Sequence, residues 1–488
     1  MTKAKTLGEL KATGYRPLTI KEELRKNLIL SLQKGTNPFE GIIGYEHTVI
    51  PDIQRALLSK HNILLLGLRG QAKTRIARQM IGLLDEYIPV VAGSEINDDP
   101  LAPLSRYAKD LISEHGDETP IEWLHRDRRY VEKLATPDVT VADLIGDLDP
   151  IKAANLRLPY GDERVLHFGL IPRSHRSIFV INELPDLQPR IQVALFNILQ
   201  EGDIQIRGFK VRLPLDLQFI FTANPEDYTN RGSIITPLKD RIESQILTHY
   251  PNSVDIAKQI TSQEADINPE VRAKVHVPDL LLSILERISF VARDSEYIDD
   301  RSGVSARMSI TALENLFSTA ERRTLINNES KTSARITDFW GVIPAITGKV
   351  ELVYEGEQEG PYQVALNLLS KSIREEFLNY FPHPTKEERK REGDVYAALR
   401  QFFSNGHEVN LPNDASDESY RETLMKIPGL KALVKQIPEE DQLAYMELVI
   451  HGLAEFNVIN KELTGTSLSF HDFLSNMLDD LDDEEDED

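Results

Sequence analysis

The sequence predicts an α/β fold, in which a five-stranded parallel sheet flanked by helices is followed by a helical lid and a mainly helical C-terminal region. Between Asn37 and about Pro251, short apolar runs alternate with helical stretches, which is typical of a parallel sheet. One of these runs leads through a loop with two glycines, Gly67–Thr74, directly into a helix. The residues after this region are rich in predicted helices.

The expected elements follow in chain order. Residues 1–36 form a polar lead and a helix that ends at Gly35, because glycine readily takes the left-handed conformation at a helix end. The five expected strands are residues 62–67, 88–93, 177–182, 217–223 and 244–250. The expected domains are a helical segment at 1–36, the α/β domain at 37–251, the lid at 252–330, a mainly helical region at 331–478 and a disordered acidic tail at 479–488.

Composition narrows the possible functions. The 488 residues carry a formal net charge of -22, which argues against a nucleic-acid binder because phosphate backbones favour basic surfaces. There is no cysteine, so disulfides and thiol catalysis are excluded, and the twelve histidines form no close ligand pair for a second metal site. The N-terminus lacks the apolar core of a signal peptide, and no run approaches the ~20 apolar residues of a membrane span. We therefore expect a soluble, cytoplasmic protein.

The loop "GLRGQAKT" has the spacing of a phosphate-binding loop, G-x-x-x-x-G-K-[ST], except at Ala72. Its backbone N–H groups are expected to hold phosphates, while Lys73 reaches the β- and γ-phosphates and Thr74 ligates Mg²⁺. A residue just before the lysine is expected near helical backbone angles, where a methyl group is tolerated. The alternative is a glycine-rich turn of any α/β fold. The candidate ATP-binding residues are Gly67, Leu68, Arg69, Gly70, Gln71, Ala72, Lys73 and Thr74.

The third expected strand ends in Asn182-Glu183, where such strands normally end in Asp-Glu. Glu183 can accept a proton from an attacking water, although a carboxylate there also suits the start of the following helix. The Asn182 amide oxygen can hold a Mg²⁺-bound water without a negative charge. Losing one charge-assisted hydrogen bond costs about 1–3 kcal/mol, so we expect slow hydrolysis and predict that Asn182→Asp lowers the Mg²⁺ requirement about ten-fold.

Three further polar residues lie at suggestive places. Asn224 ends the fourth strand, where its amide can orient the attacking water, but Asn-Pro also simply starts a turn. Arg241 precedes the fifth strand and suits contact with a γ-phosphate on a neighbouring subunit, unless it pairs with Asp240 or Glu243. Arg307 lies in the first turns of a later helix and otherwise is an ordinary surface arginine.

With these motifs, the sequence resembles AAA+ ATPases, specifically the branch of the MoxR-type ATPases and the magnesium-chelatase motor subunit. The resemblance covers about residues 37–325. It rests on the phosphate loop, on "FEGIIGYEHTVIPDIQRAL", on "VADLIGDLDP…LHFGLIPRSHRSIFVINELPDL" with its chelatase-type insertion, and on "TANPEDYTNRG" and "PLKDR". Residues 203–214 resemble the hairpin that this branch places before the fourth strand. Ala before the lysine is common in MoxR-type loops.

The resemblance implies roles for individual residues. It implies that Lys73 contacts the phosphates and that Thr74 ligates Mg²⁺. It further implies that Glu183 is the catalytic base and Asn224 the first sensor residue. It also implies Arg241 as the finger contributed across a ring interface and Arg307 as second sensor in the lid. Gly44 and Tyr45 would lie near the adenine. Asn182 departs from the family pattern, which affects metal affinity and turnover rather than nucleotide binding.

Two kinds of function follow from the resemblance. The first is an ATP-hydrolysing motor in a ring, usually a hexamer, that remodels a partner as a chaperone or in metal insertion. Its partner would be a separate protein with a von Willebrand A domain, because this chain shows no "DxSxS" cluster. The second is a scaffold that binds nucleotide without hydrolysing it. The acidic tail is either a solubilising end, an electrostatic contact for a basic partner or a plug over a basic ring pore.

Overall fold

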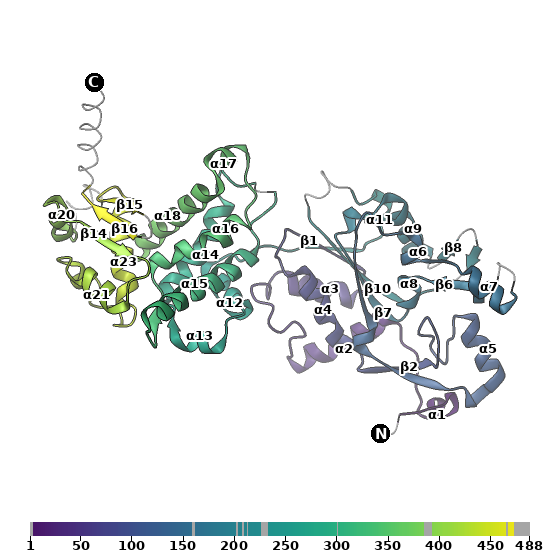
Figure 1. Ribbon diagram of the computed structural model, residues 1–488. Coiled ribbons are helices and arrows are strands. Elements are labelled where there is room, and N and C mark those ends of the chain that lie inside the picture. Colours follow the sequence, from purple (N-terminus) through teal and green to yellow (C-terminus); the bar gives the residue numbers. More distant parts are fainter. Residues whose placement is uncertain are drawn as a thin grey trace. The chain divides into compact units, whose positions relative to one another are not determined.

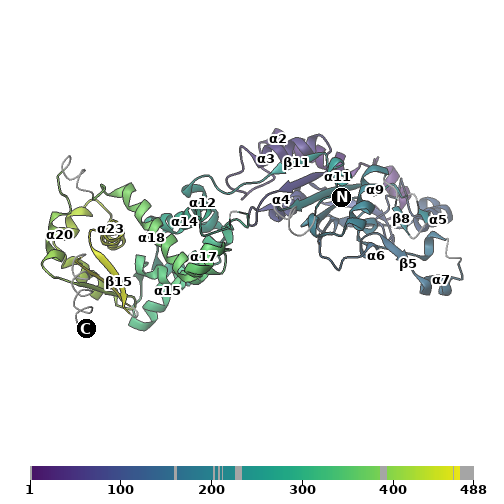
Figure 2. The same ribbon diagram turned by 90° about the horizontal axis from the view of Figure 1, so that it is seen from above.

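The computed structural model describes residues 3–158, 162–201, 204–206, 209–211, 213–225, 233–299, 301–384, 393–464 and 467–472. The chain forms two compact units, Met1–His249 and Tyr250–Asp488 (Figures 1 and 2). Within the described ranges, no helix has the length and apolarity needed to cross a membrane. The predicted acidic tail at 479–488 lies outside the described residues.

The first unit is built on a parallel five-stranded sheet with the order β11-β1-β10-β7-β4. Its strands are β11 (Ser244–Leu247), β1 (Ile63–Leu66), β10 (Leu217–Ala223), β7 (Ser177–Asn182) and β4 (Tyr130–Leu134). Every residue of the three central strands is buried, because helices cover both faces of the sheet. The predicted five-stranded α/β sheet is confirmed.

One of the five predicted strands was placed wrongly. The apolar run at 88–93 corresponds to β2 (Tyr87–Val91), which pairs antiparallel with β3 (Ile121–His125) in a separate two-stranded sheet. The fifth strand of the main sheet is instead β4, which the sequence analysis missed. As an edge strand, β4 is partly exposed along its whole length and includes Glu132 and Lys133, so it lacks the apolar run of a central strand.

Helices cover the sheet on two sides (Figure 1). Helices α2 (Ile20–Lys34), α3 (Val49–Leu58) and α4 (Lys73–Gln79) pack on one face in a core with β1, β7 and β10. The other face packs against α8 (Leu170–Arg173), α9 (Pro189–Glu201) and α11 (Thr236–Asp240). As predicted, α2 ends at Gly35, which takes a left-handed conformation with φ 68°. Because Ile20, Leu24 and Leu28 of α2 belong to this core, α2 is part of the α/β unit.

Two short hairpins accompany the sheet. One consists of β5 (Gly146–Leu148) and β6 (Leu166–Phe168), and the other of β8 (Ile204–Ile206) and β9 (Phe209–Val211). The second hairpin precedes β10, where the resemblance placed a hairpin. Among the described residues of this unit, the remaining α-helices are α1 (Leu7–Ala12), α5 (Arg106–His115), α6 (Val141–Leu144) and α7 (Pro150–Leu156).

The second unit is mainly helical and has a single hydrophobic core that runs from Val275 to Phe470. It contains one three-stranded sheet of β14 (Val409–Pro412), β16 (Ser467–His471) and β15 (Asn460–Thr464), and a short pair of β12 (Val275–His276) and β13 (Thr332–Ser333). Where the structure describes this unit, its α-helices are α12 (Val254–Glu264), α13 (Pro269–Lys274), α14 (Asp279–Arg293), α15 (Ala306–Asn327), α16 (Ile343–Thr347), α17 (Tyr354–Glu359), α18 (Pro361–Tyr380), α20 (Ala397–Ser404), α21 (Asp417–Met425), α22 (Leu430–Leu433) and α23 (Gln442–Glu455). The predicted lid and the region after it thus share one core.

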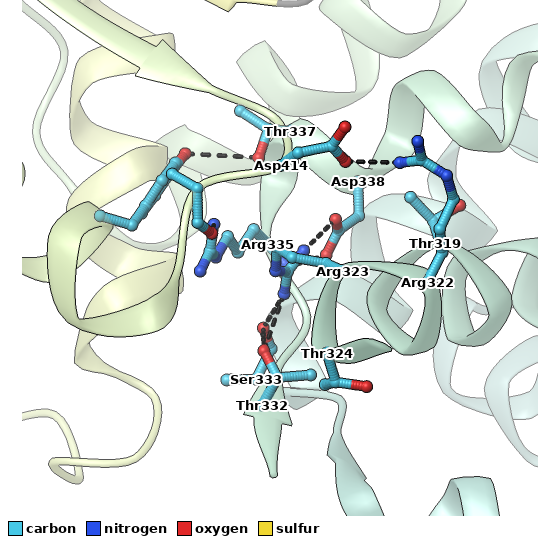
Figure 3. Close-up of polar contacts among 12 residues, drawn as sticks. Thr319, Arg322, Arg323, Thr324, Thr332, Ser333, Arg335, Thr337, Asp338 and Asp414 are labelled. Carbon is cyan, nitrogen blue, oxygen red and sulfur yellow. Dashed lines mark hydrogen bonds and ion pairs between the residues drawn. The ribbon is translucent and has the colours of Figure 1, made fainter. Parts of the chain in front are cut away.

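A buried charge network lies where α15 meets the segments that follow it (Figure 3). Arg323 on α15 forms an ion pair with Asp338, and its guanidinium also donates to Ser333 O at 2.7 Å. Arg335 forms an ion pair with Asp417 and lies over the ring of Tyr420, 4.0 Å from its centroid. The network joins residues of the predicted lid to residues of the C-terminal region.

We expect Glu447, next to this network, to make the second unit less stable as the pH rises. Burial raises its pKa from an ordinary value of 4.5 to about 7, and its carboxyl accepts bonds from the Tyr420 hydroxyl and from Ile336 N. The folded state therefore binds the proton more tightly, so the stabilisation is complete below pH ~4.5 and is lost as the pH rises through ~7. The shift corresponds to about 3 kcal/mol.

Chemical denaturation at pH 5 and pH 8 tests this expectation. The wild-type chain should lose stability relative to Glu447→Gln between these values, because glutamine keeps a polar side chain but does not ionise. If the free energies of unfolding of the two proteins change in parallel, Glu447 does not titrate in this range.

Candidate nucleotide-binding site

The predicted phosphate loop lies between β1 and α4, and close packing fixes its first glycine. A Cβ atom at Gly67 would collide with the side chains of Thr248 and Gln71, so only glycine fits there. Thr248 donates a 2.6 Å hydrogen bond to the Gln71 side chain. Gly70 has φ 73°, in the left-handed region that favours glycine. Close packing thus explains the glycine at position 67, and the left-handed backbone explains the glycine at position 70.

Ala72 differs from its predicted conformation. It caps α4 with φ 56° and ψ 15°, which is left-handed and not the ordinary helical conformation expected from the sequence. The chain turns sharply between the loop and α4, and this turn requires the left-handed region. A Cβ in this region costs roughly 1–2 kcal/mol, which explains why glycine is the usual residue in the motif.

We expect Ala72→Gly to leave stability unchanged within about 0.5 kcal/mol or to increase it, since relief of strain offsets the greater freedom of the unfolded chain. Ala154 is an exposed position in α7 of the same unit and serves as the matched control. There, substitution by glycine should cost about 1 kcal/mol. Urea denaturation compares the two variants, and equal losses would contradict a strained Ala72.

Lys73 begins α4 and is only 8% exposed. Its ammonium group donates to Gly67 O and, at 2.9 Å, to Leu68 O, so it lies back over the loop. Thr74 follows in the first turn of the helix and is partly exposed. Lys73 thus holds the carbonyl groups of the loop while its charge stays beside the loop backbone.

The segment before α3 also contacts the loop. The Tyr45 hydroxyl donates to Gln71 O at 3.1 Å and to His249 O at 2.7 Å, and its ring meets the His249 ring edge-on. Gly44 has φ 85° and donates its N–H to Glu46. Tyr45 therefore connects the loop, by hydrogen bonds, to the segment that directly follows β11. The place of an adenine beside Gly44 and Tyr45 stays a prediction.

The other candidate residues lie at the same edge of the sheet as the loop, because the carboxyl ends of parallel strands meet there. Asn224 directly follows β10, which lies between β1 and β7. Glu183 directly follows β7 and has φ 55°, a strained conformation for a residue with a side chain. Its N–H donates to the Thr222 hydroxyl at 3.1 Å. The fold thus brings Lys73, Asn224 and Glu183 to one edge.

Asn182 has a partner that the sequence analysis missed. Its Nδ2 donates to Glu132 on the neighbouring strand β4 at 2.6 Å, and its Oδ1 accepts from the Thr222 hydroxyl at 3.1 Å. Glu132 also accepts from Arg78 Nε at 2.9 Å and from the Tyr130 hydroxyl at 3.2 Å. The only local signal was a carboxylate in the short alternating run "YVEKL", which was not recognised as a strand.

No protein-family model matches the chain. The competence protein ComM of Haemophilus influenzae is 22% identical over 283 residues, covering 54% of this chain and 48% of ComM. The chain thus spans about half the length of this curated relative.

Solved structures similar to the chain include an ATPase and a chelatase complex. One is a candidate ATPase of Cytophaga hutchinsonii, with 17% identity, a TM-score of 0.28, and coverage of 74% of this chain and 98% of that one. Another is the BchI–BchD complex of magnesium chelatase, with 19% identity, a TM-score of 0.34, and coverage of 66% and 98%.

The order of the strands, with the loop after β1 and the acid after β7, matches the motif order read from the sequence. The chain is similar to AAA+ ATPases of the MoxR and magnesium-chelatase branch. The remaining candidates are the two arginines. Arg241 directly follows α11, and its side chain is 42% exposed and pairs with Asp240 at 2.9 Å, which is the alternative named from the sequence.

Arg307 belongs to the second unit, in the first turn of α15, where its N–H donates to the Ser305 hydroxyl at 3.2 Å. Its side chain is exposed. The structure describes each unit by itself, so the role of Arg307 beside a nucleotide stays a prediction. The same holds for Arg241, whose partner site would lie on another subunit.

The residues present fit ATP and Mg²⁺. Within the described part of the chain, the N–H groups of Gly70 and Ala72 have no hydrogen-bond acceptor, so they can serve a phosphate. Lys73 supplies a positive charge beside them, and Thr74 and Asn182 supply oxygen ligands of the kind Mg²⁺ takes. Among the described residues, no group of three or more acidic or histidine side chains forms a metal site.

Proposed function

We propose that this chain binds ATP with Mg²⁺ at Gly67–Thr74 and hydrolyses it, as the motor subunit of a ring that remodels a partner protein. The observation that carries the proposal is the convergence of Lys73, Asn224 and Glu183 at one edge of the sheet. When bound, the metal would neutralise charge on the phosphates. The chain's own groups would do the rest, with Lys73 holding phosphate, Asn224 orienting water and Glu183 accepting its proton.

Steady-state phosphate release tests the hydrolysis. The wild-type protein should release phosphate from ATP, and Glu183→Gln should reduce the rate by about 10²–10⁴-fold, the usual contribution of a general base. The variant should still bind a fluorescent ATP analogue, because Glu183 is not part of the loop. A wild-type protein that binds ATP without releasing phosphate would favour a non-hydrolysing scaffold, the second candidate, for which Asn182 is the supporting observation.

The exposed Arg241 supports a site shared between subunits, and mixing of variants tests it. Arg241→Ala subunits keep the base, and Glu183→Gln subunits keep the arginine. In a ring mixed in equal amounts, about a quarter of the interfaces would pair an intact base with an intact arginine. Each variant alone should be inactive and the mixture partly active. No recovery in rings shown to be mixed would contradict a shared site.

The remodelled partner is the finer part of the proposal. The resemblance suggests a separate protein with a von Willebrand A domain, and a hexameric ring of this chain. Sedimentation of the wild-type protein with and without ATP measures the ring size, and the expected result is a larger assembly with ATP.

A further inference from the structure

The side chain of Asn182 is held from two sides and is 8% exposed. On one side its amide nitrogen donates to Glu132, and on the other its amide oxygen accepts from Thr222. An amide has a donor end and an acceptor end, and only the donor end can face a carboxylate. The orientation of Asn182 is therefore fixed by Glu132.

Glu132 lies on the face of the sheet that carries the phosphate-loop helix. It pairs in register with Val180 on β7, two residues before Asn182, so the side chains of Glu132 and Asn182 point to one face. That face packs against α4. Arg78 on α4, which donates to Glu132, lies one turn after Thr74 on the same side of the helix. Glu132 thus bridges the end of β7 and the helix that carries the predicted metal ligand.

An aspartate at position 182 would be poorly matched to this neighbour. Its oxygen would take the place of the amide nitrogen, 2.6 Å from a Glu132 oxygen, and two carboxylates at that distance repel each other. Asparagine removes the repulsion and adds a hydrogen bond to a charged acceptor. The pair Asn182–Glu132 therefore carries one negative charge, on the neighbouring strand, and this charge forms an ion pair with the largely exposed Arg78.

We propose that Glu132 supplies the metal site with the negative charge that Asn182 lacks, and that Asn182 positions this carboxylate. The proposal deepens the proposed function and rests on it. It also reverses the expectation drawn from the sequence, because Asn182→Asp now adds a second carboxylate beside Glu132 and does not restore a missing one.

The experiment compares the wild-type chain with Glu132→Gln, Asn182→Asp and the double variant. The wild type and the double variant each have one carboxylate in the pair, Glu132→Gln has none and Asn182→Asp has two. The measured quantity is the Mg²⁺ concentration at which a fluorescent ATP analogue reaches half of its maximal binding. A thermal melt without Mg²⁺ or nucleotide accompanies each titration. Glu122→Gln is the matched control, the same change at an exposed position on β3.

Glu132→Gln should raise the Mg²⁺ requirement about ten-fold, the scale of one lost charge-assisted interaction. Asn182→Asp should not lower the requirement, and it should lower the melting temperature without Mg²⁺. The double variant should return to within about three-fold of wild type, because its aspartate again has an amide donor beside it. Glu122→Gln should change nothing.

Two results would overturn the proposal. The first is a Mg²⁺ requirement of Glu132→Gln that lies within about two-fold of the wild-type value. The second is a Mg²⁺ requirement of the double variant that is as high as that of Glu132→Gln. If Glu132→Gln does not fold, the double variant decides, and a requirement ten-fold above wild type counts against the proposal. A wild-type chain that binds no nucleotide at any Mg²⁺ concentration would refute the proposed function and this inference with it. Mg²⁺-dependent binding that ignores Glu132 would refute this inference alone.

Discussion

Replacement of Lys73 by alanine should weaken the binding of a fluorescent ATP analogue by about 100-fold or more. The ammonium group lies beside the loop backbone, and hydrogen bonds between charged groups contribute about 1.5–3 kcal/mol each. The substitution also removes the donor to Gly67 O and Leu68 O, so the loop loses a contact that shapes it. Fluorescence titration at saturating Mg²⁺ measures the effect.

Lys26→Ala is the control for this prediction. Lys26 lies on α2 of the same unit, is exposed, and forms only a loose ion pair with Asp85 at 3.8 Å. Its removal should leave the affinity unchanged. If Lys73→Ala and the wild type bind the analogue with equal affinity, Gly67–Thr74 is not a phosphate-binding loop.

Replacement of Asp338 by alanine should destabilise the second unit by about 3–5 kcal/mol, because it removes the nearest anion of the buried Arg323 guanidinium and leaves only the more distant Asp417, 4.0 Å from Arg323 Nε. Arg323 and Asp338 are both almost fully buried. The substitution also removes the acceptor of Arg335 N at 2.8 Å. Chemical denaturation, followed by a probe in the second unit, measures the loss.

The adjacent arginine on α15 provides a matched control (Figure 3). Arg322 forms an ion pair with Asp414 at 2.5 Å, but the two side chains are 64% and 43% exposed. Asp414→Ala should therefore cost only about 0–1 kcal/mol. A similar loss for both aspartate variants would mean that burial of the Arg323 pair does not determine its contribution.

The sequence was sufficient for features whose cause is local. The central strands are continuous apolar runs because both of their faces are buried, and the loop follows from the spacing of Gly67, Gly70 and Lys73. The edge strand β4 was missed because one side of it meets no neighbouring strand, so partly exposed polar residues interrupt its apolar pattern.

The rest of the site depends on contacts between distant residues. Glu132 precedes Asn182 by 50 positions, and only the register of β4 with β7 brings the two together. Without that register, asparagine looked like the loss of a charge. The conformation of Ala72 was also beyond the sequence, because the turn into α4 and not the residue type determines its φ. The burial of Arg323 and Arg335 likewise depends on contacts with residues such as Asp417, which lie far from them in the sequence.

Helix α15 connects two features of the second unit. Arg307 lies at its first turn, and Arg323 lies sixteen residues later, about 24 Å along the axis at 1.5 Å per residue. At that far end, ion pairs and the common core join the helix to the segments that lead to β14 and α21. Because α15 and the C-terminal sheet belong to one hydrophobic core, a displacement of the helix at Arg307 would move the sheet together with it.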